Sequence, residues 1–362
     1  MALARTYSVA LVGVMGHLIE IEADIADGLP ATILVGLPDK ALREARDRIR
    51  AAITNSGEVW PNKKITVGLS PAALPKRGSG FDLAIAIAIL AADEAIPVTA
   101  AAGTMFLAEL GLDGRLRPVP GVLPAVVTAE SGVRTVVVAA ENVVEAELVP
   151  GVRVIGASSL AEVLTWLRGG PPPTLPALPE PPAGPPPALA MAKKLDLAEV
   201  LGQAEARLAV EICAAGGHNL SLLGPPGAGK TMLAERLPTI LPKLEKRASI
   251  EVTSIHSVAG MLRAEGGLVT VPPFCAPHHT ATKAAIVGGG SELIRPGAAS
   301  LAHRGVLFLD EAHEPTARPL HHQSRRCGAL AEGVIAGKHH FLLLLTCWRS
   351  VVLRDKLPRA VA

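Results

Sequence analysis

The feature that most constrains this chain is a proline-rich stretch near its middle. Residues Gly169 to Pro187 read GGPPPTLPALPEPPAGPPP, with ten prolines in nineteen residues. Proline lacks a backbone N–H and fixes φ, so neither a helix nor a sheet strand is expected to pass through the stretch. It is predicted to be an extended, semi-rigid spacer. A ligand for a proline-binding domain is the less common use of such a composition.

The spacer divides the chain into parts that are each long enough to build a core. The 362 residues are 49% hydrophobic but only 2% aromatic, so aliphatic cores are expected. We predict a first domain over residues 1–168, a linker over 169–189, a second domain over 190–345 and a basic tail over 346–362.

The first domain reads as alternating strands and helices, which is typical of an α/β fold. An amphipathic helix is expected over residues 39–57, with Asp39 as its N-cap, an apolar face that includes Ala45, Ile49 and Ile53, and Gly57 at its end. The other predicted elements are strands at 8–14, 31–37 and 64–70, a buried helix at 81–94, a hairpin turning at Asp113-Gly114, and a helix, turn and strand over 125–142.

After the spacer, residues 196–218 read as one helix with Gly216-Gly217 at its end, and a phosphate-binding loop is predicted after it. The sequence GPPGAGKT, Gly224 to Thr231, matches the pattern G-x-x-x-x-G-K-[ST], and it lies between an apolar strand and a helix. Gly227 and Gly229 allow the backbone to curl, so that several N–H groups point at phosphates. Lys230 is expected to reach the β- and γ-phosphates, and the Thr231 hydroxyl to bind Mg²⁺ at a helix start. The predicted ATP-binding residues are Gly224, Pro225, Pro226, Gly227, Ala228, Gly229, Lys230, Thr231 and Met232. The alternative is an ordinary glycine-rich turn.

A second half of the same site is predicted at Asp310-Glu311. These carboxylates follow the apolar run VLFL, which reads as a buried strand. Such a strand would deliver them to the sheet edge that carries the phosphate loop. Asp310 is expected to hold Mg²⁺ through water, and Glu311 to act with Lys230 in catalysis by polarising the attacking water. A strand end that happens to carry two acids is the alternative.

The letters D-E-A-H at residues 310–313 also match the signature of the DEAH-box helicases. That class needs a second RecA-like domain after the motif, and 49 residues follow His313. We therefore interpret the Ala and His as incidental.

Residues from about 190 to 311 resemble the AAA+ module of the magnesium-chelatase-like ATPases, the ComM/YifB group. The resemblance rests on GPPGAGKTMLAERLPTILP, SIHSVAG, APHHTAT, VGGG and RPGAASLAHRGVLFLDE. The first and last are shared by many AAA+ proteins, whereas the middle ones in this order are more specific. The resemblance implies a P-loop core with three α/β/α layers.

The first domain resembles the Lon-protease-like fold of ribosomal S5 type. ALPKRGSGFDLAIAIAIL is similar to the Lon segment that carries the nucleophilic serine, and the segment from Gly111 to Asn142 is similar to the one that carries the lysine. The serine position falls on Gly80, with Ser79 one residue away, and Pro120–Val127 contains no lysine. A Ser-Lys dyad needs both groups, so we do not expect a protease.

What this family implies is an ATP- and Mg²⁺-dependent hexameric ATPase. Its best-understood activity is DNA branch migration in recombination and natural transformation, with DNA as a partner. Chelatase subunits instead drive metal insertion into a porphyrin with partner proteins. A third interpretation is a nucleotide-binding remnant with little turnover.

The resemblance decays after Glu314, and the core is expected to be incomplete at its C-terminus. The family pattern continues to a strand ending in an asparagine that senses the γ-phosphate. Phe341–Thr346 is the candidate for that strand, with the sensor position near Trp348, yet no asparagine follows Asn219. An arginine finger and a helical lid are not recognisable. From Thr316 onward the sequence contains eight Lys or Arg residues and only two acidic residues. This excess indicates either a DNA-contacting surface or the product of a frame change.

Other features exclude function classes. A net charge of +2 gives no global case for nucleic acid. The four cysteines form no CxxC pair, and the spacing of His313, His321, His322, His339 and His340 fits no common metal site. The longest apolar run, Leu83–Ala92, is too short to span a membrane. A cytoplasmic protein with no membrane partner is expected.

Overall fold

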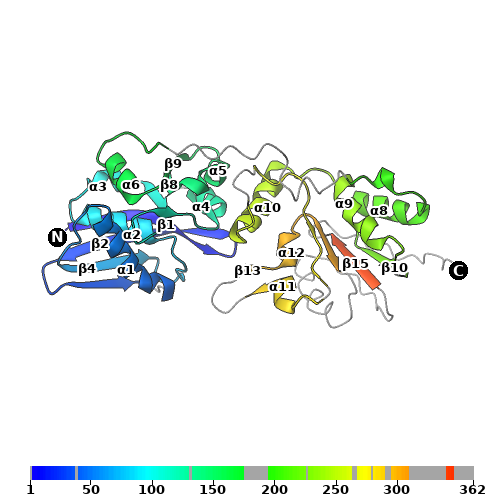
Figure 1. Cartoon of the computed structure of the whole chain (residues 1–362), viewed down its shortest axis with the longest axis horizontal. Helices are drawn as coiled ribbons and strands as arrows, with labels where there is room; N and C mark the ends of the chain where they lie inside the picture. The colour runs from blue at the N-terminus through cyan, green and yellow to red at the C-terminus, as the bar shows by residue number, and fades with distance from the viewer. Residues whose placement is uncertain are drawn as a thin grey trace. The chain divides into compact units, whose positions relative to one another are not determined.

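The computed structural model describes residues 2–36, 40–129, 133–174, 195–225, 227–262, 267–278, 280–289, 295–309 and 340–345. The chain forms two compact units (Figure 1). The first comprises Met1–Ala183 and His256–Leu268, and the second comprises Gly184–Ile255 and Val269–Ala362. The segment His256–Leu268 thus belongs to the first unit, although the predicted domain boundaries, which remain a proposal, put it in the second.

The first unit is built on a mixed sheet of seven strands in the order β3-β4-β2-β1-β5-β8-β9. The pairs β1–β2 and β2–β4 are antiparallel, and the other four pairs are parallel. The strands are β1 (Ala2–Val12), β2 (Met15–Ala26), β3 (Ala31–Val35), β4 (Lys64–Ser70), β5 (Thr104–Leu107), β8 (Thr135–Ala139) and β9 (Arg153–Ala157).

Helices cover both faces of this sheet because its strands alternate their side chains between two cores. On β8, Val137 and Ala139 join a core with α1, α2 and α6, whereas Val136 and Val138 join a core with α4 and α5. The helices are α1 (Lys40–Asn55), α2 (Asp82–Ala92), α3 (Val98–Ala101), α4 (Val122–Ala129), η1 (Ala140–Asn142), α5 (Val143–Ala146) and α6 (Leu160–Leu167).

Most elements predicted for this unit are confirmed. In α1, Ala45, Ile49 and Ile53 are buried, and every residue of α2 is buried. The short hairpin of β6 (Glu109–Leu110) and β7 (Leu116–Arg117) turns at Asp113-Gly114, where Gly114 has φ +80°. Asp39, the predicted N-cap of α1, lies outside the described residues. The predicted likeness to the Lon-type fold remains a prediction.

The second unit has a sheet of four strands in the order β10-β15-β14-β11, and a separate pair β12–β13. The strands are β10 (Leu220–Leu223), β11 (Phe274–Cys275), β12 (Gly288–Gly289), β13 (Arg295–Pro296), β14 (Val306–Leu309) and β15 (His340–Leu345). The helices are η2 (Leu197–Glu199), α8 (Ala204–Gly216), α9 (Lys230–Ile240), α10 (Lys246–Val258), α11 (Lys283–Val287) and α12 (Ala298–Leu301).

The fully buried strand β14 shows that this unit has three layers. Val306 and Phe308 pack in a core with α8 and α9, whereas Leu307 and Leu309 pack in a second core with α11 and α12. A strand that is apolar on both faces is expected when helices cover both sides of a sheet. In the described part of this unit, helices therefore lie against both faces of β14, and the P-loop core implied by the resemblance remains a prediction.

The single helix predicted before β10 is wrong, because the structure has two helices there. The sequence from Asp196 to His218 reads as one helix, but the structure has the short helix η2, a break at Gly202-Gln203, and then α8. Both residues at the break have positive φ, +72° for Gly202 and +49° for Gln203, which a continuing helix cannot accommodate. The apolar periodicity on either side concealed the break.

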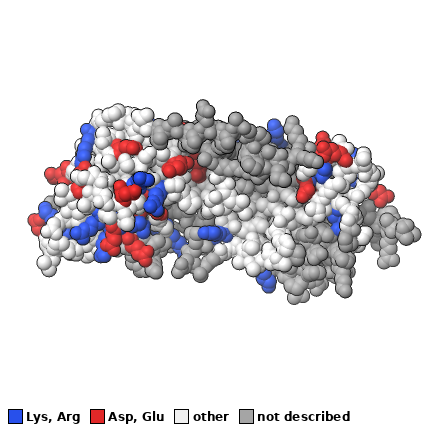
Figure 2. Space-filling view, in the orientation of Figure 1, with Lys and Arg blue, Asp and Glu red and all other residues white. Residues whose placement is uncertain are grey.

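Charged side chains of both signs are interspersed over the first unit. On the face seen in Figure 2, Lys and Arg lie among Asp and Glu rather than in one extended basic patch. Ion pairs such as Arg5 with Glu22, at 2.8 Å, reflect this mixing. The basic stretch after Thr316 lies outside the described residues, apart from the strand β15.

Candidate functional site

The predicted phosphate loop connects β10 to α9 in the second unit. Gly227 and Gly229 have φ of +80° and +79°, a conformation that side chains with a Cβ rarely adopt. Gly229 is also the residue directly before α9, which starts at Lys230. The loop therefore ends at a helix N-terminus, where backbone N–H groups and the helix dipole favour an anion.

Lys230 is held across the loop. Its side chain is buried, with 8% of the residue exposed, and Nζ donates to the carbonyl oxygens of Gly224 at 2.6 Å and Pro225 at 2.7 Å. A buried ammonium needs such partners because desolvation of an unpaired charge is costly. The amine is thus kept within the loop at the N-terminus of α9.

Gly229 is a closely packed position of the loop. A Cβ on Gly229 would lie 3.0 Å from Gln203 Nε2 and 3.2 Å from Met232 Cε. Both this close approach and the positive φ favour glycine at this position. Thr231 is exposed on the first turn of α9, the position from which a threonine hydroxyl would bind Mg²⁺ in the predicted motif. Pro226 lies outside the described residues.

The strand that leads to the predicted carboxylates has the expected direction. Both β10 and β14 pair antiparallel with β15, so β10 and β14 run parallel to each other. Their carboxyl ends, Leu223 and Leu309, therefore point to the same edge of the sheet, the edge of the phosphate loop. Asp310 and Glu311 themselves lie outside the described residues.

The candidate sensor strand, β15, runs antiparallel to both β10 and β14. β15 lies between β10 and β14, with His340 paired to Leu223 and Leu345 paired to Val306. Its amino end is therefore at the edge of the phosphate loop, and its carboxyl end is at the opposite edge. The predicted sensor position near Trp348 lies outside the described residues.

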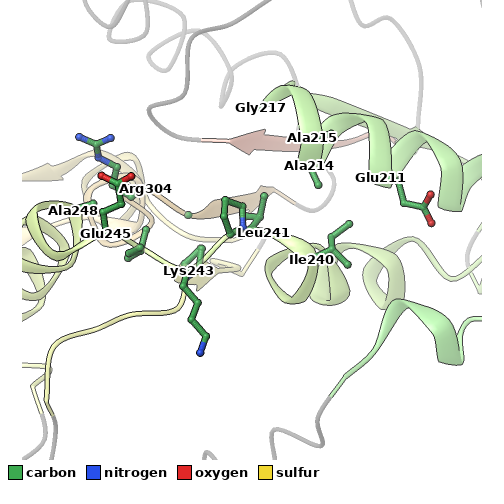
Figure 3. A pocket seen from close by; sticks show the side chains of 14 residues that line it. Glu211, Ala214, Ala215, Gly217, Ile240, Leu241, Lys243, Glu245, Ala248 and Arg304 are labelled. Atoms are coloured by element: carbon green, nitrogen blue, oxygen red, sulfur yellow. The ribbon is translucent and has the colours of Figure 1, made fainter.

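A cavity of about 660 Å³ lies at that opposite edge (Figure 3). Gly217, which leads into β10, and Gly305, which leads into β14, both line it, together with the end of α8 and the loop after α9. In Figure 3 the side chain of Lys243 points away from Leu241. The cavity is thus separate from the phosphate loop, which starts at the other end of β10.

In the first unit, the residues near the degenerate serine position are engaged with one another. The Ser79 hydroxyl donates to the Glu109 carboxylate, and the buried Lys76 ammonium donates to the carbonyl of Pro71. Burial lowers the pKa of Lys76. The segment in which Lon-type proteases carry the lysine forms the start of α4, and the Ser79 hydroxyl has a carboxylate as its partner.

Beside them lies a buried ion pair that the sequence did not indicate. Asp82 at the start of α2 is fully buried, and Arg48 of α1 donates to both of its oxygens, Nε at 2.9 Å and a terminal nitrogen at 3.1 Å. Burial raises the pKa of the Asp82 carboxyl to about 6, although the hydrogen bonds and charge of Arg48 act to lower it. The pair fixes α1 against α2, which are distant in sequence.

Neither a metal centre nor a membrane span is found among the described residues. Within them, no group of three or more His, Cys, Asp or Glu side chains is placed to hold a metal ion. Across the same part of the chain, no helix is both long and apolar enough to cross a membrane.

Two family descriptions match this chain. Residues 196–326 match the sequence model described as magnesium chelatase, subunit ChlI, and residues 21–142 match one described as subunit ChlI of Mg-chelatase. The first match contains the phosphate loop, β14 and the predicted carboxylates. It continues past Glu314, where the resemblance was expected to decay.

Named relatives cover both units. The chain is 54% identical over 320 residues to the uncharacterised protein Rv2897c of Mycobacterium tuberculosis, covering 87% of this chain and 61% of that protein. It is 44% identical over 315 residues to the competence protein ComM of Haemophilus influenzae, covering 87% and 61%. It is 41% identical over 340 residues to YifB of Escherichia coli, covering 94% and 64%. The chain thus spans about three fifths of the length of these relatives.

Proposed function

Because the chain belongs to the magnesium-chelatase-like family of ComM and YifB proteins, we propose that its second unit binds ATP with Mg²⁺. The observation that carries the proposal is the loop between β10 and α9. Two glycines with positive φ and the buried Lys230 meet there at a helix N-terminus. This arrangement offers backbone N–H groups and one ammonium to a polyphosphate.

Each loop residue has a role in this proposal. The loop N–H groups would hold the phosphates, and Lys230 would exchange its carbonyl partners for phosphate oxygens. Thr231 and Asp310 would hold the Mg²⁺ ion, which neutralises charge on the phosphates, and Glu311 would orient a water molecule. The parallel direction of β10 and β14 supports this pairing, because it brings both carboxyl ends to one edge.

We further propose that the ATPase acts as a homo-oligomer on DNA. The support is the family membership and the similarity to the protein named competence protein ComM. Hexamer formation and DNA branch migration are what the resemblance implies, and both are proposals for this chain. A chelatase-type subunit that works with partner proteins is a second candidate, favoured by the descriptions of both matching family models.

A third candidate, nucleotide binding with little turnover, is favoured by β15. Its carboxyl end lies at the edge of the sheet away from the phosphate loop, whereas the sensor asparagine of the family follows the carboxyl end of its strand. No asparagine follows Asn219 in the sequence. A γ-phosphate sensor of the family type is therefore not identified in this chain.

We expect the purified chain to bind ATP but hydrolyse it slowly, at about 0.01 s⁻¹ or less, because an arginine finger alone is worth about 10³–10⁵ in rate. Release of inorganic phosphate under saturating Mg·ATP measures this, with Glu311→Gln as the background. A turnover of several per second that Glu311→Gln abolishes would show that the chain supplies a complete catalytic site.

A further inference from the structure

Gln203 occupies an unusual position directly before α8. Its φ of +49° places it in the left-handed region of backbone conformation, which residues other than Asn, Asp and Gly rarely adopt. The preceding Gly202 is also left-handed, and these two residues form the break between η2 and α8. An unfavourable backbone conformation at a non-glycine residue persists when surrounding contacts hold it there.

The contact at Gln203 is made with the phosphate loop. Its side-chain amide donates from Nε2 to the carbonyl oxygen of Ala228 at 2.9 Å. The same nitrogen lies where a Cβ on Gly229 would approach to 3.0 Å, so the amide lies against the loop backbone. Gln203 and Ala228 are 25 residues apart, and this bond joins the turn before α8 to the loop before α9.

The turn that carries Gln203 is itself anchored to α9. Arg236 of α9 donates to the carbonyl of Asp196 at 3.0 Å and to the Glu199 carboxylate at 3.2 Å. Leu197 and Val200 are buried in the core that includes α9. Gln203 therefore reaches the loop from a base that is fixed to the same helix the loop leads into.

The bond to Ala228 has a direct consequence for the neighbouring N–H. In a trans peptide the C=O and the following N–H point in opposite directions within one plane. Fixing the Ala228 carbonyl toward Gln203 therefore directs the Gly229 N–H away from Gln203. That N–H belongs to the loop glycine directly before Lys230, among the groups expected to bind a phosphate.

We propose that Gln203 is a positioning residue of the nucleotide site, which fixes the Ala228–Gly229 peptide so that the Gly229 N–H is preorganised for a phosphate oxygen. This inference rests on the proposed ATP binding. A residue that preorganises a binding loop lowers the cost of ordering it when ligand binds. Loss of Gln203 should accordingly lower the affinity for nucleotides whose phosphates bind in this loop, while leaving the fold intact.

The test compares two substitutions with one control. Gln203→Gly removes the amide and suits a positive φ, so backbone strain cannot explain its effect. Gln203→Glu keeps the length but replaces the donor with a carboxylate that repels the Ala228 carbonyl. Glu205→Gln, an exposed change in the first turn of α8, is the control. Isothermal titration with Mg·ATP and with Mg·ADP, and the melting temperature of the nucleotide-free full chain, are measured for each.

We expect Gln203→Gly to bind both nucleotides about tenfold more weakly than the wild type, and Gln203→Glu to bind them more weakly still. Glu205→Gln should bind both with wild-type affinity. The nucleotide-free melting temperatures should agree within about 2 °C. Wild-type affinity in Gln203→Gly would overturn the inference while the proposed function stands. A lower melting temperature in Gln203→Gly would also overturn it, by showing a structural role. If the wild type binds neither nucleotide, the proposed function fails first.

Discussion

Replacing Lys230 with alanine is expected to weaken Mg·ATP binding at least about 100-fold, from a micromolar dissociation constant to one beyond easy measurement. The ammonium is buried within the loop, and it is the one side-chain cation that the loop sequence supplies. Charge-assisted hydrogen bonds to phosphate are among the strongest in proteins, and a loss of about 3 kcal/mol corresponds to the stated factor. Isothermal titration of the full chain measures it.

The matched control is Lys243→Ala. Lys243 lies after α9 and lines the 660 Å³ cavity at the opposite edge of the sheet, so the substitution removes the same charge from the same unit. The affinity of this variant for Mg·ATP should equal that of the wild type. Weaker Mg·ATP binding by Lys243→Ala together with normal binding by Lys230→Ala would show that the nucleotide binds in that cavity. It would contradict the proposed binding in the phosphate loop.

Replacing Arg48 with alanine is expected to destabilise the first unit by about 3 kcal/mol at pH 8. Asp82 is fully buried, and Arg48 is 24% exposed, so the substitution leaves a buried carboxylate without its cation. Removing one partner of a buried pair costs more than the pair contributes, because the remaining charge stays desolvated. Calorimetry of the full chain measures the melting transition of the unit.

The pH dependence of this effect has a definite sign. The folded-state pKa of Asp82, about 6, lies above its ordinary value of 3.8, so the folded protein binds more protons than the unfolded chain between these values. The contribution of Asp82 to stability is therefore fully present below about pH 4 and is lost as pH rises through 6. Without Arg48 the folded pKa should rise further. The Arg48→Ala defect should thus be smaller at pH 5 than at pH 8.

Two variants separate charge from packing. Arg46→Ala removes an exposed arginine of the same helix, whose partner Asp47 is 76% exposed, and it should have little effect. Adding Asp82→Asn to Arg48→Ala removes the unpaired charge and should recover part of the loss at pH 8. An Arg48→Ala defect that is equal at both pH values would show that lost packing, rather than the buried carboxylate, is responsible.

Local patterns in the sequence are sufficient to predict many elements. The strand β4 coincides with the predicted KITVGLS, and α2 is buried along its whole length as its uninterrupted apolar sequence indicates. The glycine-rich turn between β10 and α9 is predictable because it is a contiguous motif in a recognisable context. Its glycines adopt the left-handed conformations that the motif requires.

One strand escapes prediction although its signal is present. β2 carries Ile19, Ile21, Ala23 and Ile25 in alternation with Glu20, Glu22 and Asp24, and its alternate residues are buried. This period of two is typical of a strand with one polar face. The acidic residues give the segment a polar composition, which conceals the alternation.

Other features depend on contacts between distant parts of the chain. The direction of β15 follows from its pairing with β10 and β14, and an apolar run has no direction of its own. The pairing of Arg48 with Asp82 and the bond from Gln203 to Ala228 join residues 34 and 25 positions apart. Gly202 within a helical pattern is a usable warning of the break, since glycine is unfavourable in a helix interior.

Titration of the folded wild-type chain with Mg·ATP tests the central claim most directly. We predict saturable binding with a micromolar dissociation constant and one nucleotide per chain, and binding at least about 100-fold weaker by Lys230→Ala. Circular dichroism on the same sample establishes that the protein is folded. A folded wild-type chain that gives no binding signal at millimolar Mg·ATP would contradict the assignment of the Gly224–Thr231 loop as a nucleotide site.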